Sequence, residues 1–277
     1  MSTMEQTPDF TNPPIVEFVL GVQFAPLENM TTGHLGLFWE HLGRGGWPMV
    51  GDEPPLDPQF ELFDKPKWRV ARQLQFKLQP GFQPGRFTLQ NAEQDRMIQF
   101  QDTRLLLNWR KTSGQNVKYP SYKVLIHDFE KHFSLLSEFV RTHNLGELQP
   151  NQWEITYVDS FPQGELWESP ADWQKILPGL FGTLSTTQEV SLVLEHRAAE
   201  WSYEIAPKRG RLHVNAQVGF LPDSAKSSLL LNLTARGPIG STGVPTLREG
   251  LDLGHEVSVR EFLGMVSPDV KATWEKK

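Results

Sequence analysis

The chain has 277 residues, a formal net charge of −6 from 27 basic and 33 acidic side chains, and no cysteine. The charge argues against a generally cationic surface that would neutralise many phosphates, although a local basic patch is compatible with it. The absence of cysteine excludes disulfides, thiolate nucleophiles and Cys-ligated metal centres.

The first folded element is predicted from the stretch NPPIVEFVLGVQF, residues 12–24. Its even-numbered positions from 16 to 24 are large and apolar, and this period of two is typical of a β-strand. Pro13 and Pro14 precede the strand, where a missing N–H removes no ladder hydrogen bond. Glu17 lies on the second face, where we expect a solvated or edge-facing side chain rather than a functional carboxylate.

Residues 31–43 follow with apolar side chains at helical spacing, a threonine cap and Gly43 as the stop, so we predict a short amphipathic helix. Residues 44–68 contain many glycines and prolines, which predicts a long loop without regular structure over most of its length. Strand patterns resume at residues 69–78, 86–91, 96–101 and 104–111, and a long helix is predicted over 127–146 with Asp128 as its cap.

The same order of elements recurs in the second half. We predict a strand over 151–161 and a short helix capped by Ser169, with Pro170 in its first turn. Further strands are predicted over 189–196, 200–206, 211–220 and 228–236. The third of these has the clearest alternation: apolar side chains at the even positions 212 to 220, and the polar side chains of Arg211, His213, Asn215 and Gln217 between them. A closing helix presents an apolar stripe, and Ser267 and Pro268 begin one more helical turn.

Each half therefore has the order strand, short helix, several antiparallel strands, long helix. The predicted class is α+β with antiparallel sheets, in two β-α-β(3–4)-α halves at residues 1–146 and 147–277. Two such copies resemble the arrangement of the TATA-box-binding-protein fold, and a helix laid on a curled antiparallel sheet also resembles helix-grip folds. We expect an internal duplication, although residue identity between the halves is weak.

No catalytic motif is evident. The chain lacks HExxH, GxSxG and the phosphate-binding glycine patterns, and we predict no metal, no cofactor and no catalytic residue. Basic and aromatic residues alternate in residues 105–123, a mixture that can stack on bases and pair with phosphates but more often packs at a sheet rim. Trp and Tyr also provide large contact areas at protein interfaces. The candidate binding residues are Trp47, Trp68, Trp109, Arg110, Lys111, Tyr119 and Tyr122.

Several stretches together resemble one family. These are the opening NPPIVEFVLGVQF, YPSY before the middle helix, WEITYVD in the second half and FLGMVSPDVKATW at the end. They are similar to an uncharacterised, sporadically distributed family of prokaryotic proteins of about this length, with Asp159 standing where the family pattern has Asn. The resemblance implies no activity or site residues. It implies an association with mobile defence-type loci, including CRISPR-adjacent genes.

The leading hypothesis is a non-enzymatic binding or accessory protein that engages a protein partner through an open sheet face or a groove between the halves. A nucleotide- or nucleic-acid-dependent hydrolase and a small-ligand-sensing module are the alternatives. The N-terminus lacks a basic and an apolar region of the kind found in signal peptides, so we expect a cytoplasmic protein that neither enters nor spans a membrane.

Overall fold

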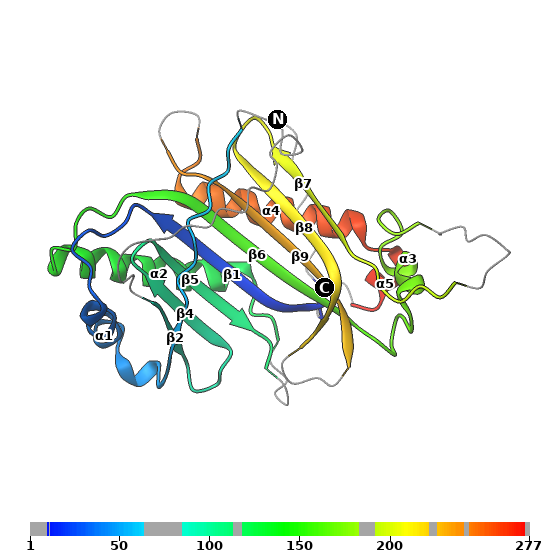
Figure 1. Ribbon diagram of the computed structural model, residues 1–277, viewed down its shortest axis with the longest axis horizontal. Helices are drawn as coiled ribbons and strands as arrows, with labels where there is room; N and C mark the ends of the chain where they lie inside the picture. The colour runs from blue at the N-terminus through cyan, green and yellow to red at the C-terminus, as the bar shows by residue number, and fades with distance from the viewer. Residues whose placement is uncertain are drawn as a thin grey trace.

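The computed structural model describes residues 10, 12–63, 85–112, 118–182, 192–221, 226–240 and 244–274. Within these residues, one antiparallel sheet of nine strands has the order β2-β3-β4-β5-β1-β6-β9-β8-β7 (Figure 1). The strands are β1 (Ile15–Phe24), β2 (Met49–Glu53), β3 (Arg86–Gln90), β4 (Arg96–Gln101), β5 (Arg104–Arg110), β6 (Pro150–Pro162), β7 (Ala199–Ile205), β8 (Gly210–Phe220) and β9 (Ser227–Pro238). The predicted mixture of helices and antiparallel sheet is confirmed, and the sheet dominates.

The two long helices lie on the same side of the sheet, behind it in the view of Figure 1. They are α2 (Tyr122–Thr142) and α4 (Leu247–Met265). The shorter elements are α1 (Thr32–His41), α3 (Trp173–Ile176), α5 (Pro268–Ala272) and the 3₁₀ turns Arg44–Gly46 and Pro170–Asp172. The helices cover one face of the sheet, and the other face carries no helix among the described residues.

The predicted opening strand is confirmed as β1, which lies at the middle of the sheet between β5 and β6. Leu20 pairs with Leu107 on one side and with Ile155 on the other, and all three side chains are buried on the face that the helices cover. The alternation seen in the sequence therefore places one set of side chains in the core and leaves the other set on the opposite face.

Helix α1 packs beside α2 and covers part of the core. Phe38 of α1 lies between Phe100 of β4, at a ring-centroid distance of 4.5 Å, and Phe139 of α2, at 5.2 Å. All three rings are fully buried. The predicted short helix thus joins the first half of the sheet to its long helix.

Helix α4 approaches the sheet through small residues. Gly250 and Gly254, one turn apart, face the side chains of Trp153 and Ile155, and Ser258 is buried one turn further on. These small residues precede, along the helix, the apolar stripe from which the helix was predicted. The indole of Trp153 fills the space that larger helix residues would take.

Three sequence predictions need correction. Residues 49–53 form the edge strand β2 inside the predicted loop, because Pro48 and Pro54 lie on either side of the strand and not within it. Helix α2 begins at Tyr122 and not near Asp128, since Leu125 and Ile126 extend its buried stripe toward the N-terminus.

The third correction concerns the strand predicted over 189–196. Residues 192–196 form no strand, and Leu192 and Val193 are 64% and 81% exposed, so these two apolar side chains are not part of the core. Residues 189–191, and the strand predicted over 69–78, lie outside the described residues. The remaining predicted strands correspond to β3, β4, β5, β6, β7, β8 and β9.

None of the helices in the described part of the chain is both long enough and apolar enough to cross a membrane.

Candidate site on the open face of the sheet

The face of the sheet opposite α2 and α4, which we call the open face, carries mainly polar side chains. The strand registers place Gln23, Arg104 and Gln152 side by side across β1, β5 and β6. A neighbouring row places Glu154 next to Arg236 and Arg211 across β6, β9 and β8. These positions alternate with the buried ones, so the strand pattern that builds the core also builds this polar face.

Residues 54–63, which we call the crossing segment, leave β2 and run over this face (Figure 1). Pro54, Pro55 and Pro58 cannot donate ladder hydrogen bonds, and none of these residues belongs to a strand. Because the segment lacks strand pairing, its attachment depends on contacts with side chains of the sheet.

Five side chains of the sheet bind the backbone of the crossing segment. Arg86 donates to Pro54 O at 3.3 Å and Arg211 to Leu62 O at 3.2 Å, at its two ends. Gln101 holds Leu56 on both sides: Leu56 N–H donates to Gln101 Oε1 at 2.9 Å, and Gln101 Nε2 donates to Leu56 O at 3.0 Å. Gln59 N–H donates to Gln23 Oε1 at 2.7 Å, and Arg104 donates to Asp57 O at 3.3 Å. These contacts satisfy backbone groups that the prolines prevent from pairing in a sheet.

Beyond Gln59, the carboxylate of Glu61 meets three basic side chains. Its Oε1 lies 2.5 Å from His213 Nε2 and 3.0 Å from Arg236 Nε, and its Oε2 accepts a short hydrogen bond from Arg211. The guanidinium of Arg211 also lies 5.0 Å from the ring centroid of Phe63. Only 7% of the Glu61 side chain is exposed.

The pKa of Glu61 follows from these neighbours. Burial alone would raise it, but the hydrogen bond from His213 and the charges of His213 and Arg236 lower the pKa below its ordinary value. Glu61 is therefore held as a carboxylate, and it is the anchor of the crossing segment on the second half of the sheet.

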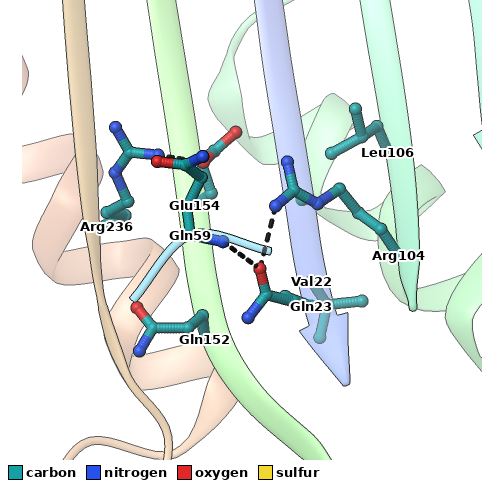
Figure 2. A pocket seen from close by; sticks show the side chains of 9 residues that line it. Val22, Gln23, Gln59, Arg104, Leu106, Gln152, Glu154 and Arg236 are labelled. Atoms are coloured by element: carbon teal, nitrogen blue, oxygen red, sulfur yellow. Dashed lines mark hydrogen bonds and ion pairs between the residues drawn. The ribbon is translucent and has the colours of Figure 1, made fainter. Parts of the chain in front are cut away.

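The side chains beneath the crossing segment form a cationic band, which comprises Arg86, Arg104, Arg211, His213 and Arg236 on strands β3, β5, β8 and β9. Figure 2 shows its centre, where Arg104 points to Gln23 and Arg236 to Glu154 around an open hollow of about 210 Å³. Arg104 donates to Gln23 Oε1 at 2.8 Å, and Arg236 lies 3.2 Å from the Glu154 carboxylate. Burial and then the charges of Arg236 and Arg86 lower the pKa of Arg104, while Glu154 opposes that effect.

A second hollow of about 240 Å³ lies on the same face beside the end of β5. Its lining includes Glu17, Asn108 and Arg110, and Glu17 accepts a hydrogen bond from Asn108 at 2.8 Å. Glu17 is therefore half-buried and hydrogen-bonded rather than simply solvated. Arg110, a candidate from the sequence, is half-exposed at this hollow.

The other candidate binding residues do not gather at one place. Trp109 is in the core at 1% exposure, and Tyr119 packs edge-on against it. Lys111 is exposed after β5, whereas Trp47 accepts a hydrogen bond at its carbonyl from Trp39 and packs on His132. Trp68 lies outside the described residues.

Tyr122 belongs to a polar cluster on the helix side of the sheet. Its ring stacks on His255 at 4.0 Å, and its hydroxyl donates to Asp252 at 2.7 Å. The hydroxyl of Tyr157 lies 2.6 Å from His255 Nδ1. These contacts connect the start of α2 with α4 and β6, so they hold the two long helices together across the middle of the sheet.

Burial has opposite effects on two groups of this region. It lowers the pKa of His255 to about 4, and it raises the pKa of the Asp159 carboxyl well above its ordinary value. Asp159 is 2% exposed, and its Oδ1 has no hydrogen-bond partner in the described part of the chain. His255 is therefore uncharged near neutral pH, and burial favours the protonated form of Asp159.

The open face is suited to binding through hydrogen bonds and charge. Among the residues that the structure describes, no three His, Asp or Glu side chains converge as metal ligands would. Sequence reasoning missed Gln23, Gln101 and Glu61 as contact residues. The alternation in β1 placed Gln23 on the second face of its strand, and the alternation in β8 did the same for Arg211 and His213. Nothing in residues 54–63 identified Glu61 as the partner of Arg211 and His213.

No family model matches the sequence, and no curated protein matches it either. The structure defines a class of architecture: a mixed α/β protein with one large antiparallel sheet, two long helices on one face and a polar open face crossed by a segment of its own chain.

Proposed function

We propose that this is a non-enzymatic binding or accessory protein that engages a protein partner through the open face of its sheet. The observation that carries the proposal is the crossing segment. Side chains of the open face already hold one extended polypeptide, with Gln23, Gln101 and Arg104 bonded to its backbone. A surface with this chemistry is able to hold a second extended chain in the same way.

The part of the open face beyond the crossing segment supports the same conclusion. Val158 and Thr156 of β6 and Asn232 and Thr234 of β9 form adjacent pairs there and are all partly exposed. Thr156 and Thr234 hydrogen-bond to each other at 2.9 Å. The hydroxyl and amide groups that surround Val158 can hydrogen-bond to a partner, and none of these four side chains carries a charge that would be buried unpaired.

The alternatives have less support. A nucleic-acid partner would require many free cations, and Arg211 and Arg236 of the band already pair with Glu61 and Glu154 in a chain of net charge −6. A small-ligand sensor would favour an enclosed apolar cavity, whereas both hollows described above, in the part of the chain that the structure describes, are open and lined mainly by polar residues. No described contact favours the hydrolase.

The duplication and the TATA-box-binding-protein-like arrangement are part of the proposal. In each half the first strand is central, the last strand lies next to it, and a long helix follows that last strand: β1, β5 and α2, then β6, β9 and α4. This order supports two related units with a boundary near residue 146. The cytoplasmic location and the link to a defence-type or CRISPR-associated locus are predictions without further support.

The test uses the full chain as bait in extract of the native host, with two matched charge variants. Val158→Arg places a long cation at the centre of the open face, whereas Val124→Arg makes the same change on the exposed surface of α2. We expect the partner to be recovered by the wild type and by Val124→Arg. With Val158→Arg we expect recovery to fall by at least about tenfold, because the new side chain obstructs the interface and changes its charge. Equal recovery by both variants, or turnover of a model substrate by a partner-free protein, would contradict the proposal.

A further inference from the structure

The contacts of the crossing segment depend little on its sequence. Leu56, Asp57 and Gln59 are all held through backbone N–H or C=O groups. Any extended chain offers these groups at the same spacing. The contacts made by Gln23, Gln101 and Arg104 therefore do not depend on the side chains of Leu56, Asp57 and Gln59.

One side chain of the segment supplies the charge that the band requires. Arg211, His213 and Arg236 converge on the carboxylate of Glu61, and Glu154 is the only other carboxylate paired with Arg236 in the described residues. Without Glu61, the guanidinium groups of Arg211 and Arg236 would lie together, partly buried, with Glu154 as the remaining paired carboxylate. An occupant of the band must carry an acidic group at this position.

Apolar burial contributes little to holding the segment in place. Phe60 and Leu62 are 55% and 70% exposed, the prolines of the segment are exposed as well, and Leu56 and Phe63 are only half-buried. The hollow under the segment is lined by two apolar side chains, Val22 of β1 and Leu106 of β5, and otherwise by polar residues and Gly21. Removing the segment would expose polar side chains rather than the core, so its release is compatible with a folded sheet.

We propose that the cationic band is a binding site for an extended acidic peptide of a partner protein, and that residues 54–63 occupy it as an internal ligand. This inference rests on the proposed function and names the chemistry of the partner. The incoming peptide would take the backbone bonds to Gln23, Gln101 and Arg104 and would place a carboxylate between Arg211 and Arg236. The internal segment and the partner would compete for one surface.

The experiment measures binding of a labelled synthetic peptide, PPLDPQFELF, to the full-length protein by fluorescence anisotropy. In the wild type the tethered segment competes at an effective concentration in the millimolar range, so we expect weak binding. In Glu61→Ala the internal ligand has lost its anchor, and we expect the peptide to bind at least about tenfold more tightly. The same peptide carrying Glu61→Gln should lose that gain, because it lacks the carboxylate.

Two further arms separate peptide binding from a folding defect and from nucleic-acid binding. Glu61→Gln in the protein, which keeps a hydrogen-bonding oxygen, replaces Glu61→Ala if the latter does not show the circular dichroism of the folded wild type. A ten-nucleotide oligothymidylate is added as competitor: failure to displace the peptide supports the inference, and tighter binding than the peptide overturns it in favour of a nucleic acid. Equal affinity of the peptide for wild type and variant, or equal affinity of both peptides, also overturns it.

The two proposals can fail separately. If Val158→Arg loses the cellular partner while the peptide binds no variant, the open face binds a partner but the band is not the peptide site. If the peptide binds Glu61→Ala and no partner depends on the open face, the band binds acidic peptide but the proposed function is wrong.

Discussion

The approach of α4 to the sheet gives a sharp test of the packing. A Cβ added at Gly250 would lie 2.2 Å from Cδ1 of Trp153 and 2.5 Å from its Cγ and Nε1. The indole is fully buried, so it has no free space to move into. A Cβ added at Gly36, inside α1, would meet nothing within 4 Å.

The two glycines therefore separate helix propensity from packing. Alanine in place of glycine favours a helix by about 1 kcal/mol, and this gain applies to both positions. At Gly250 the overpacking of a filled core costs about 1–3 kcal/mol and more if the helix must move away. We expect Gly36→Ala to raise the free energy of unfolding by up to about 1 kcal/mol, and Gly250→Ala to lower it by up to about 2 kcal/mol once the helix-propensity gain is subtracted from the packing cost.

Urea unfolding followed by tryptophan fluorescence and by circular dichroism measures both variants against the wild type. Coincidence of the two probes establishes that the transition has two states. If Gly250→Ala is as stable as Gly36→Ala, then α4 does not approach Trp153 this closely and the packing described for the second half is wrong.

Three further predictions concern buried or strained groups. Burial lowers the pKa of His255 from 6.5 to about 4, so this histidine binds a proton in the unfolded chain at a higher pH than in the folded protein. The free energy of unfolding of the wild type should therefore fall by up to about 3 kcal/mol as the pH is lowered from 6.5 to 4. His255→Asn should flatten that part of the urea-midpoint profile, and an unchanged slope would contradict the assignment. Asp159 has a raised pKa, so its folded form gains protons and stability is lost as pH rises above 3.8. Asp159→Asn should therefore be more stable than the wild type at pH 8, with the difference vanishing in acid; a less stable variant at pH 8 would refute this. Ser121 has φ 85° and its side chain makes no cap hydrogen bond, so Ser121→Gly should raise the thermal midpoint by the equivalent of about 1 kcal/mol, whereas a lower midpoint would show that the backbone there is unstrained.

Local pattern was sufficient for most of the secondary structure. The period of two in residues 12–24 and 211–220 predicted β1 and β8, and the cap and breaker residues located α1 and α5. The failures have local causes as well. Two prolines concealed the short strand β2 between them, and an apolar run at 192–194 suggested a strand where no partner strand lies beside it in the described structure.

By itself, the sequence determined that a largely antiparallel sheet would form, because alternation of polar and apolar residues is a property of neighbouring positions. It also indicated that one set of side chains on each strand would be polar. Which polar residues become neighbours was decided only by the tertiary structure. Glu61 meets Arg211 across 150 positions of the chain, and Tyr157 meets His255 across 98. Such pairs depend on strand order, on the side of the sheet that the helices cover and on the path of residues 54–63, and none of these is encoded by the spacing of residues along one segment.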